Sequence, residues 1–150
     1  MIAYPDTSFL CALYRKQENS PAAARWFAGM REPLHVSTLL LFEFRQGVRY
    51  QTFLHARDKR KGYGKVEADA ALAALQTDLG SGALVVLPAD WPDVHAKAEH
   101  LSAQHTPQRG PRGFDILHIA TALHLGARDF LSFDLNQRGI AKSEGLNPTP

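Results

Sequence analysis

The sequence predicts an α/β protein with a central, mostly parallel sheet of four or five strands and helices on both of its faces. Short apolar runs alternate along the chain with longer segments whose apolar residues recur at helical spacing. Capping residues and glycines bracket most of these longer segments. Strands that alternate with helices form parallel sheets, because each helix returns the chain to the same edge of the sheet.

The first half of the chain supplies two of these strands. The expected elements are a strand at 2–4, a helix at 8–15, a helix at 21–30, a strand at 34–36 and a long helix from 38 to about 55. Ser20 and Pro21 are typical of a helix start, with a cap followed by proline at the first position. Ser37 or Thr38 caps the long helix.

The second half repeats the alternation after a basic loop at 55–65. The expected elements are a helix at 66–79 that Gly80 stops, a strand at 83–87, a helix at 90–105, a loop at 106–113, a buried helix at 114–125, a strand at 130–133 and a helix at 135–143. Residues 146–150 are expected to form at most a frayed edge strand, because two prolines weigh against a longer one.

Composition narrows the class of protein. The 150 residues predict one domain, 1–150. With 45% hydrophobic and 21% charged residues, collagen-like, coiled-coil and disordered chains are excluded. The formal charge of +2 permits a nucleic-acid partner without requiring one. A single cysteine, Cys11, an N-terminus unlike a signal peptide and the lack of a ~20-residue apolar run predict a cytoplasmic protein with no membrane partner.

Four carboxylates stand where apolar residues or strand ends are expected: Asp6, Glu43, Asp115 and Asp134. Each also has an ordinary structural explanation. The aspartates can cap the helices that follow them, and Glu43 can form a buried ion pair with a distant base such as Arg112. Because ligands of parallel sheets bind beyond the carboxyl ends of the strands, we expect the four to share one site.

Clustered carboxylates predict a hard divalent cation. Two carboxylates ~4 Å apart repel by roughly 4 kcal/mol at an effective dielectric constant near 20, and a cation removes that cost. Oxygen-only ligands favour Mg²⁺ or Mn²⁺ over zinc. A metal of this kind in a mildly basic protein indicates phosphodiester hydrolysis by a metal-activated water.

The motifs that contain these carboxylates resemble those of the PIN-domain nucleases, and within them the VapC-type toxins of toxin–antitoxin pairs. The similarity lies in YPDTSFL, LLLFEFRQG, RGFDILHIATALHLGA and DFLSFDLNQRGIAKSEGL, which occur in the family's order over nearly the whole chain. The resemblance implies an α/β/α sandwich and a Mg²⁺- or Mn²⁺-dependent ribonuclease that leaves a 5′-phosphate and a 3′-hydroxyl. It also implies a homodimer and a small antitoxin that blocks the site.

The same resemblance assigns roles to individual residues. Asp6 and Asp115 are expected to bind the first ion, and Glu43 and Asp134 to complete the site directly or through water. Ser8 matches a supporting hydroxyl position, and Thr7 is a weaker candidate. Some relatives have an acidic residue where this chain has Asn136, so the question of whether one or two metal ions bind stays open.

Basic residues form two further groups of candidates. Arg109 and Arg112 precede Asp115 and are expected at the edge of the site, where Arg112 can also pair with a carboxylate. The basic segment is expected to be either a solvated loop or a surface that contacts RNA. Its basic residues are Arg57, Lys59, Arg60, Lys61 and Lys65. His118, three residues after Asp115, is either a core histidine or a neighbour of the site.

Three alternative functions remain open on the residues alone. An aspartyl-phosphate phosphatase usually has a second aspartate two residues after the first, where this chain has Ser8. A PIN domain can also process RNA without an antitoxin, outside a toxin–antitoxin pair. A non-catalytic RNA- or protein-binding module is expected to lack an acidic residue, and all four are present.

Overall fold

The computed structural model describes residues 1–150, and all of its strand pairs are parallel. The strands are β1 (Ala3–Pro5), β2 (Leu34–Val36), β3 (Leu84–Val86), β4 (Asp129–Leu131) and β5 (Asn147–Thr149). They form a three-stranded sheet in the order β1-β4-β5 and a two-stranded sheet, β2-β3. β1 also lies beside β2, so the two sheets continue one another across the molecule.

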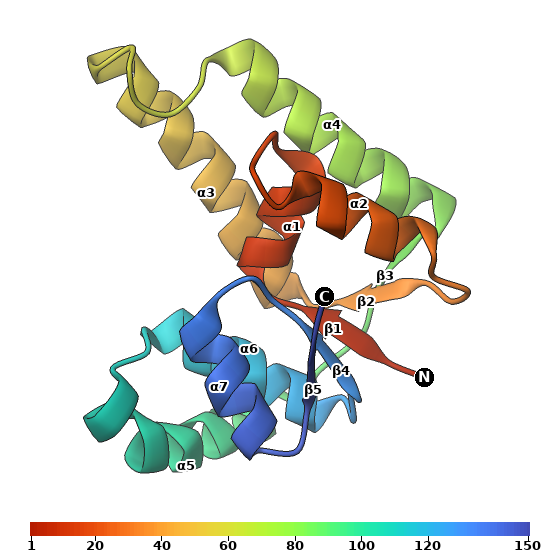
Figure 1. Ribbon diagram of the computed structural model, residues 1–150, viewed down its shortest axis with the longest axis vertical. Coiled ribbons are helices and arrows are strands. Elements are labelled where there is room, and N and C mark those ends of the chain that lie inside the picture. The colour runs from red at the N-terminus through yellow and green to blue at the C-terminus, as the bar shows by residue number, and fades with distance from the viewer.

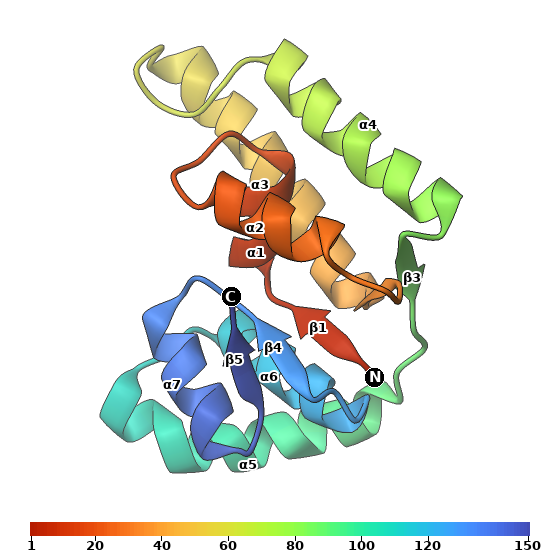
Figure 2. The ribbon, with the colours of Figure 1, turned by 45° about the vertical axis from the view of Figure 1, so that its right-hand side comes forward.

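Seven helices cover the strands on two sides. They are α1 (Thr7–Tyr14), α2 (Ser20–Ala28), α3 (Thr38–Arg57), α4 (Lys65–Ser81), α5 (Trp91–Arg109), α6 (Gly113–His124) and α7 (Leu135–Ser143). In both ribbon views α1 to α4 gather on one side of the strands and α5 to α7 on the other (Figures 1 and 2). The predicted α/β class with a parallel sheet and helices on both faces is confirmed.

The core lies between the strands and both helical layers. Its largest fully buried side chains include Tyr4 of β1, Phe9 of α1, Phe44 of α3 and Phe130 of β4. Helix α6 is buried along most of its length, as its apolar sequence predicts. None of the helices combines the length and the apolar character that crossing a bilayer requires.

Two helices, α5 and α4, end later than the sequence predicts. The predicted loop at 106–113 was wrong for its first part, because α5 continues through Pro107 to Arg109 and ends at Gly110 with φ +59°. Proline in the last turn removes only one helical hydrogen bond. Helix α4 likewise passes Gly80 and ends at Gly82, whose φ is +81°.

The chain ends in an ordered edge strand. The Asn147 N–H donates to the Arg128 carbonyl at 2.8 Å, and the Ser132 N–H donates to the Thr149 carbonyl at 3.1 Å. The short strand expected from the sequence is therefore present, since an edge position tolerates the missing N–H of Pro148.

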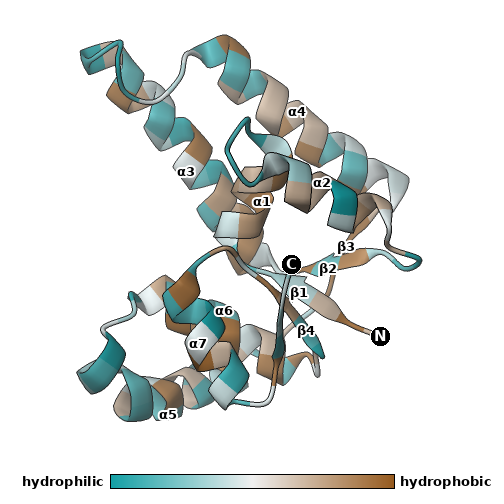
Figure 3. Ribbon diagram, viewed as in Figure 1, coloured by the Kyte–Doolittle hydropathy of each residue, from teal (hydrophilic) through white to brown (hydrophobic).

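The far end of α3, its connection to α4 and the start of α4 project away from the strands (Figures 1 and 2). Coloured by hydropathy, this projection is mostly hydrophilic (Figure 3). We call residues 49–65 the basic arm. Its tip turns at Gly62, where φ is +59° and an added Cβ would lie 2.1 Å from the Gln51 carbonyl oxygen.

Candidate active site

Asp6 is placed where β1 ends and α1 begins. Its side chain caps α1 by accepting from the Phe9 N–H at 3.0 Å, so the capping role foreseen from the sequence is real. The same oxygen accepts from the Ser8 hydroxyl at 2.6 Å, and the other oxygen accepts from the Ser132 hydroxyl. Asp6 is fully buried. Burial raises the pKa of Asp6, and the hydrogen bonds from Ser132, Ser8 and Phe9 oppose that rise.

Ser132 and Asp134 follow β4, the parallel neighbour of β1. The register pairs Pro5 with Leu131, which brings Asp6 and Ser132 together at the carboxyl ends of the two strands. The buried Ser132 hydroxyl also accepts from the Asp134 N–H at 3.0 Å. Asp134 itself caps α7 by accepting from the Gln137 N–H at 2.9 Å.

Asp115 lies in the first turn of α6 and is almost fully buried. Its carboxylate accepts from the Arg112 backbone N–H at 3.0 Å and forms an ion pair with the Arg112 guanidinium at 3.3 Å. The side-chain amide of Gln137 donates to its other oxygen at 3.2 Å. Gln137 therefore joins Asp115 to Asp134, because its backbone bonds one carboxylate and its side chain the other.

Glu43 points from α3 toward α1 and α6. It accepts from the Thr7 hydroxyl at 2.7 Å and from Nε2 of His118. Partial burial acts to raise the pKa of Glu43, but the hydrogen bond and charge of His118 outweigh it and lower that pKa. The partner of Glu43 is thus the buried His118 rather than Arg112, and His118 is a neighbour of the site.

Three of the four carboxylates, those of Asp115, Glu43 and Asp134, act on the positive charge of Arg112. The pKa of Arg112 is raised by the hydrogen bond and charge of Asp115, and further by the charges of Glu43 and Asp134. No group of three or more His, Cys, Asp or Glu side chains lies close enough together to hold a metal ion. The donors are carboxylate oxygens, the ligand type that hard divalent cations prefer, but in this arrangement they lie too far apart to hold one together. The Arg112 side chain is 80% exposed.

Two other predicted residues lie beside the site but face away from its carboxylates. The Asn136 amide donates to the Arg109 backbone carbonyl at 3.0 Å. The Arg109 side chain lies against Gly139 of α7, where an added Cβ would be 2.3 Å from its Nη1. These contacts join the end of α5 to α7, and the roles predicted for both residues stay predictions.

The basic segment is far from the carboxylates along α3, and part of its charge is already paired. Arg60 forms an ion pair with Asp58 at 3.0 Å, and Lys65 pairs with Asp69 one helical turn later. Both pairs are exposed to solvent, where ion pairs contribute little stability.

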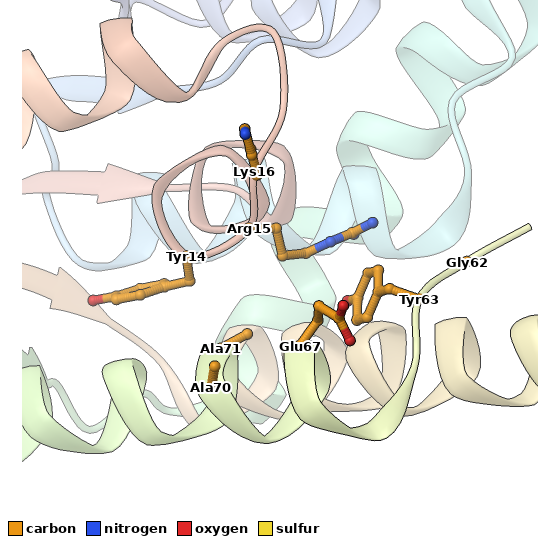
Figure 4. A pocket seen from close by; sticks show the side chains of 8 residues that line it. All are labelled: Tyr14, Arg15, Lys16, Gly62, Tyr63, Glu67, Ala70 and Ala71. Carbon is orange, nitrogen blue, oxygen red and sulfur yellow. The ribbon is translucent and has the colours of Figure 1, made fainter.

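A cavity of about 440 Å³ lies apart from the carboxylates, between α1 and α4 (Figure 4). Tyr63 of the basic arm forms one wall, and the Arg15 guanidinium lies 4.9 Å from the centroid of its ring. Cys11 accepts a hydrogen bond from Arg15 at 3.4 Å. These contacts attach Tyr63, next to the turn at Gly62, to the end of α1.

Two residues of this network went unnoticed in the sequence, Ser132 and Gln137. Ser132 lies in the SFD motif and directly follows a strand, so its position next to Asp134 was a usable signal. Gln137 carries no such signal, because polar residues on a short terminal helix are usually exposed.

Comparison with known proteins places this geometry in a family. The PIN domain model matches residues 3–143, a span that contains the first three motifs and all but the last three residues of the fourth. No curated protein matches the chain by sequence.

Several solved structures share the fold. VapC20 from Mycobacterium tuberculosis, described as a sarcin-ricin loop cleaving toxin, has a TM-score of 0.66 and 21% identity over 99% of both chains. VapBC-1 from nontypeable Haemophilus influenzae has a TM-score of 0.63 and 16% sequence identity, and the match covers 99% of this chain and 97% of the other. VapBC2 from Rickettsia felis was solved bound to a DNA fragment from its promoter. It has a TM-score of 0.64 and 15% sequence identity, with the same coverage of both chains.

Proposed function

Because the chain belongs to the PIN-domain family, whose members are in general nucleases, we propose that it is a metal-dependent endoribonuclease. The observation that carries the proposal is the arrangement of Asp6, Glu43, Asp115 and Asp134. Hydrogen bonds through Ser132 and Gln137 join Asp6, Asp134 and Asp115. The charges of Asp115, Glu43 and Asp134 all act on the Arg112 guanidinium, which relates Glu43 to the other three carboxylates.

The chemistry needs Mg²⁺ or Mn²⁺, held by Asp6 and Asp115 and completed by Glu43 and Asp134 directly or through water. When bound, the ion supplies an activated water and neutralises charge on the phosphate. Ser8 and Ser132 fix the orientation of Asp6, and Thr7 and His118 fix that of Glu43. Partners of this kind are needed because a metal ligand must be oriented before the ion arrives.

Arg112 has a second role in this proposal. In the absence of a cation its guanidinium balances the charge of Asp115, which limits the mutual repulsion of the carboxylates. Once a cation binds, the exposed guanidinium is free to contact a phosphate of the substrate.

The biological role that we propose is that of a cytoplasmic toxin, active as a homodimer and blocked by a small antitoxin. Support comes from the VapBC structures among the relatives of the same fold, which are toxin–antitoxin systems. Induced expression of the chain is then expected to arrest growth, and expression of Asp115→Asn is not.

Cleavage of total cellular RNA tests the enzymatic part. The purified chain is incubated with Mg²⁺, Mn²⁺ or EDTA, beside Asp115→Asn. Discrete fragments that need the metal and are absent with the variant support the proposal and identify the target. A folded chain that leaves all RNA intact with either metal contradicts it and favours a non-catalytic binding module.

A further inference from the structure

The solvent side of α3 carries a stacked pair of aromatic side chains. The ring centroids of Tyr50 and Phe53 lie 5.5 Å apart with an interplanar angle of 14°. The two residues are 51% and 45% exposed. The Arg57 guanidinium lies over the Phe53 ring, 3.5 Å from its centroid. Flat, exposed rings flanked by a guanidinium are the features on which unpaired bases stack.

The same region has a net positive charge, whereas the rest of the chain has a net negative charge. Residues 49–65 contain six Lys or Arg and one Asp, a formal charge of +5, whereas the whole chain has +2 and the remainder therefore −3. Arg60 and Lys65 have carboxylate partners. No carboxylate pairs with the other four cations, which are Arg49, Arg57, Lys59 and Lys61. Free cations around exposed rings complement a polyanion with accessible bases.

The aromatic pair is aligned with the candidate active site. Residues seven apart on an α-helix are offset by only about 20° around its axis and by about 10 Å along it. Glu43, Tyr50 and Arg57 are spaced by seven residues on α3 and therefore form one line along the helix. A chain that follows this line from the carboxylates meets the aromatic pair within a few nucleotides.

We propose that this face of α3 binds single-stranded RNA and directs it to the carboxylates, an inference that rests on the proposed ribonuclease function. Bases stack on Tyr50 and Phe53, and Arg57, Lys59 and Lys61 contact phosphates. A second copy of the chain fits this face less well. In a two-fold contact a surface meets itself, so the unpaired cations of both copies would be brought together.

The tip of the basic arm is held in place rather than free. Gly62 turns the chain against the Gln51 carbonyl, and the next residue, Tyr63, packs against Arg15, which follows α1 (Figure 4). His55 contacts the Lys61 carbonyl across the turn at 3.0 Å. Lys59 and Lys61 are therefore presented at a fixed distance from the aromatic pair, which lowers the entropy cost of binding.

The first test measures binding without cleavage. Fluorescence anisotropy in EDTA gives the Kd of the full chain for an unstructured, labelled RNA of twelve nucleotides. Tyr50→Leu/Phe53→Leu keeps apolar bulk but removes both rings, and is expected to weaken binding about tenfold or more. The matched control Tyr50→Phe/Phe53→Tyr keeps both rings and is expected to bind within about twofold of the parent.

The second test concerns the cations. Lys59→Gln/Lys61→Gln is compared with Arg25→Gln/Arg31→Gln, which removes the same number of exposed charges from α2 and the turn after it. The slope of log Kobs against log salt concentration is expected to become less negative by roughly 1.4 with the first pair, about 0.7 per phosphate contact. It is expected to stay unchanged with the second pair.

The outcomes separate this inference from the proposed function. Unchanged affinity of Tyr50→Leu/Phe53→Leu overturns the inference even if metal-dependent cleavage is found. Light scattering can also show that this variant has half the molecular mass of the parent. That result would assign the face to a second copy of the chain and would overturn the inference. If the parent binds RNA through the rings but cleaves none with any metal, the RNA surface stands and the proposed function fails.

Discussion

The carboxylate site and the basic arm place their charges in opposite environments. Asp6 is fully buried, and both of its oxygens accept hydrogen bonds from residues on either side of the strand ends. Lys59 and Lys61, at the other end of α3, are exposed and have no carboxylate partner. Burying a charge costs free energy, which hydrogen bonds from neighbouring groups must offset. An exposed charge interacts with other charges through the solvent and is screened by salt.

This difference determines what a substitution does in each region. At the carboxylate site, changes are expected to alter both catalysis and stability, because every side chain is bonded to another. In the basic arm, changes of charge are expected to alter binding and its salt dependence while the fold is unaffected. The backbone at the tip of the arm is an exception, since Gly62 makes the turn possible.

The largest effect is expected from Asp6→Asn. Because Asp6 is a proposed metal ligand, its loss is expected to lower cleavage by more than about 100-fold, beyond the loss typical of residues that only support a ligand. The same change raises the free energy of unfolding at neutral pH, because burial penalises the charged form of Asp6, whose pKa is raised. Metal-dependent RNA cleavage and a urea titration measure the two effects. A variant that is inactive because it is unfolded would mean that Asp6 is structural.

Gly62→Ala tests the turn of the basic arm. Its φ of +59° and the Gln51 carbonyl 2.1 Å from the added Cβ are expected to lower the free energy of unfolding by about 2 kcal/mol. Gly80→Ala is the matched control, because nothing lies within 4 Å of the added Cβ in the last turns of α4. That variant is expected to gain about 0.5–1 kcal/mol from helix propensity. Equal denaturation midpoints for the two would argue against a fixed tip.

Ser132→Ala removes the hydroxyl that connects Asp6 to the backbone of Asp134. Leaving the Asp134 N–H without its acceptor is expected to cost about 1 kcal/mol of stability, and cleavage is expected to fall about tenfold. Ser143→Ala, on the last turn of α7, removes a hydroxyl bonded only to the Ile140 carbonyl and serves as the control. Activity equal to that of the control would exclude a positioning role for Ser132.

The smallest effect on stability is expected from Lys59→Gln/Lys61→Gln. Neither lysine is bonded to a carboxylate, so the free energy of unfolding is expected to change by less than about 0.5 kcal/mol. Thermal and urea unfolding beside the parent chain check this. A large loss of stability would show that the arm has a structural role, and the contrast between the two regions would then fail.

Much of the fold was predictable because its signals are local. The capping roles foreseen for Asp6, Ser37 and Asp134 are all found, each through a backbone N–H three residues away. The burial of α6 followed from its apolar sequence. Boundaries were less predictable, as at Gly80 and Pro107, because a helix continues past a weak residue when packing on either side favours it.

The sequence by itself determined the family motifs, the alternation of strands and helices, and the presence of acids at the strand ends. Only the tertiary structure decided which partner each acid has. Glu43 meets His118 across 75 residues, and Asp6 meets Ser132 across 126. It also showed that Tyr50 and Phe53 stack in the open, beside cations that lack partners. Caps depend on neighbours within one turn, whereas these contacts depend on how strands and helices pack, and spacing along a single chain does not encode that packing.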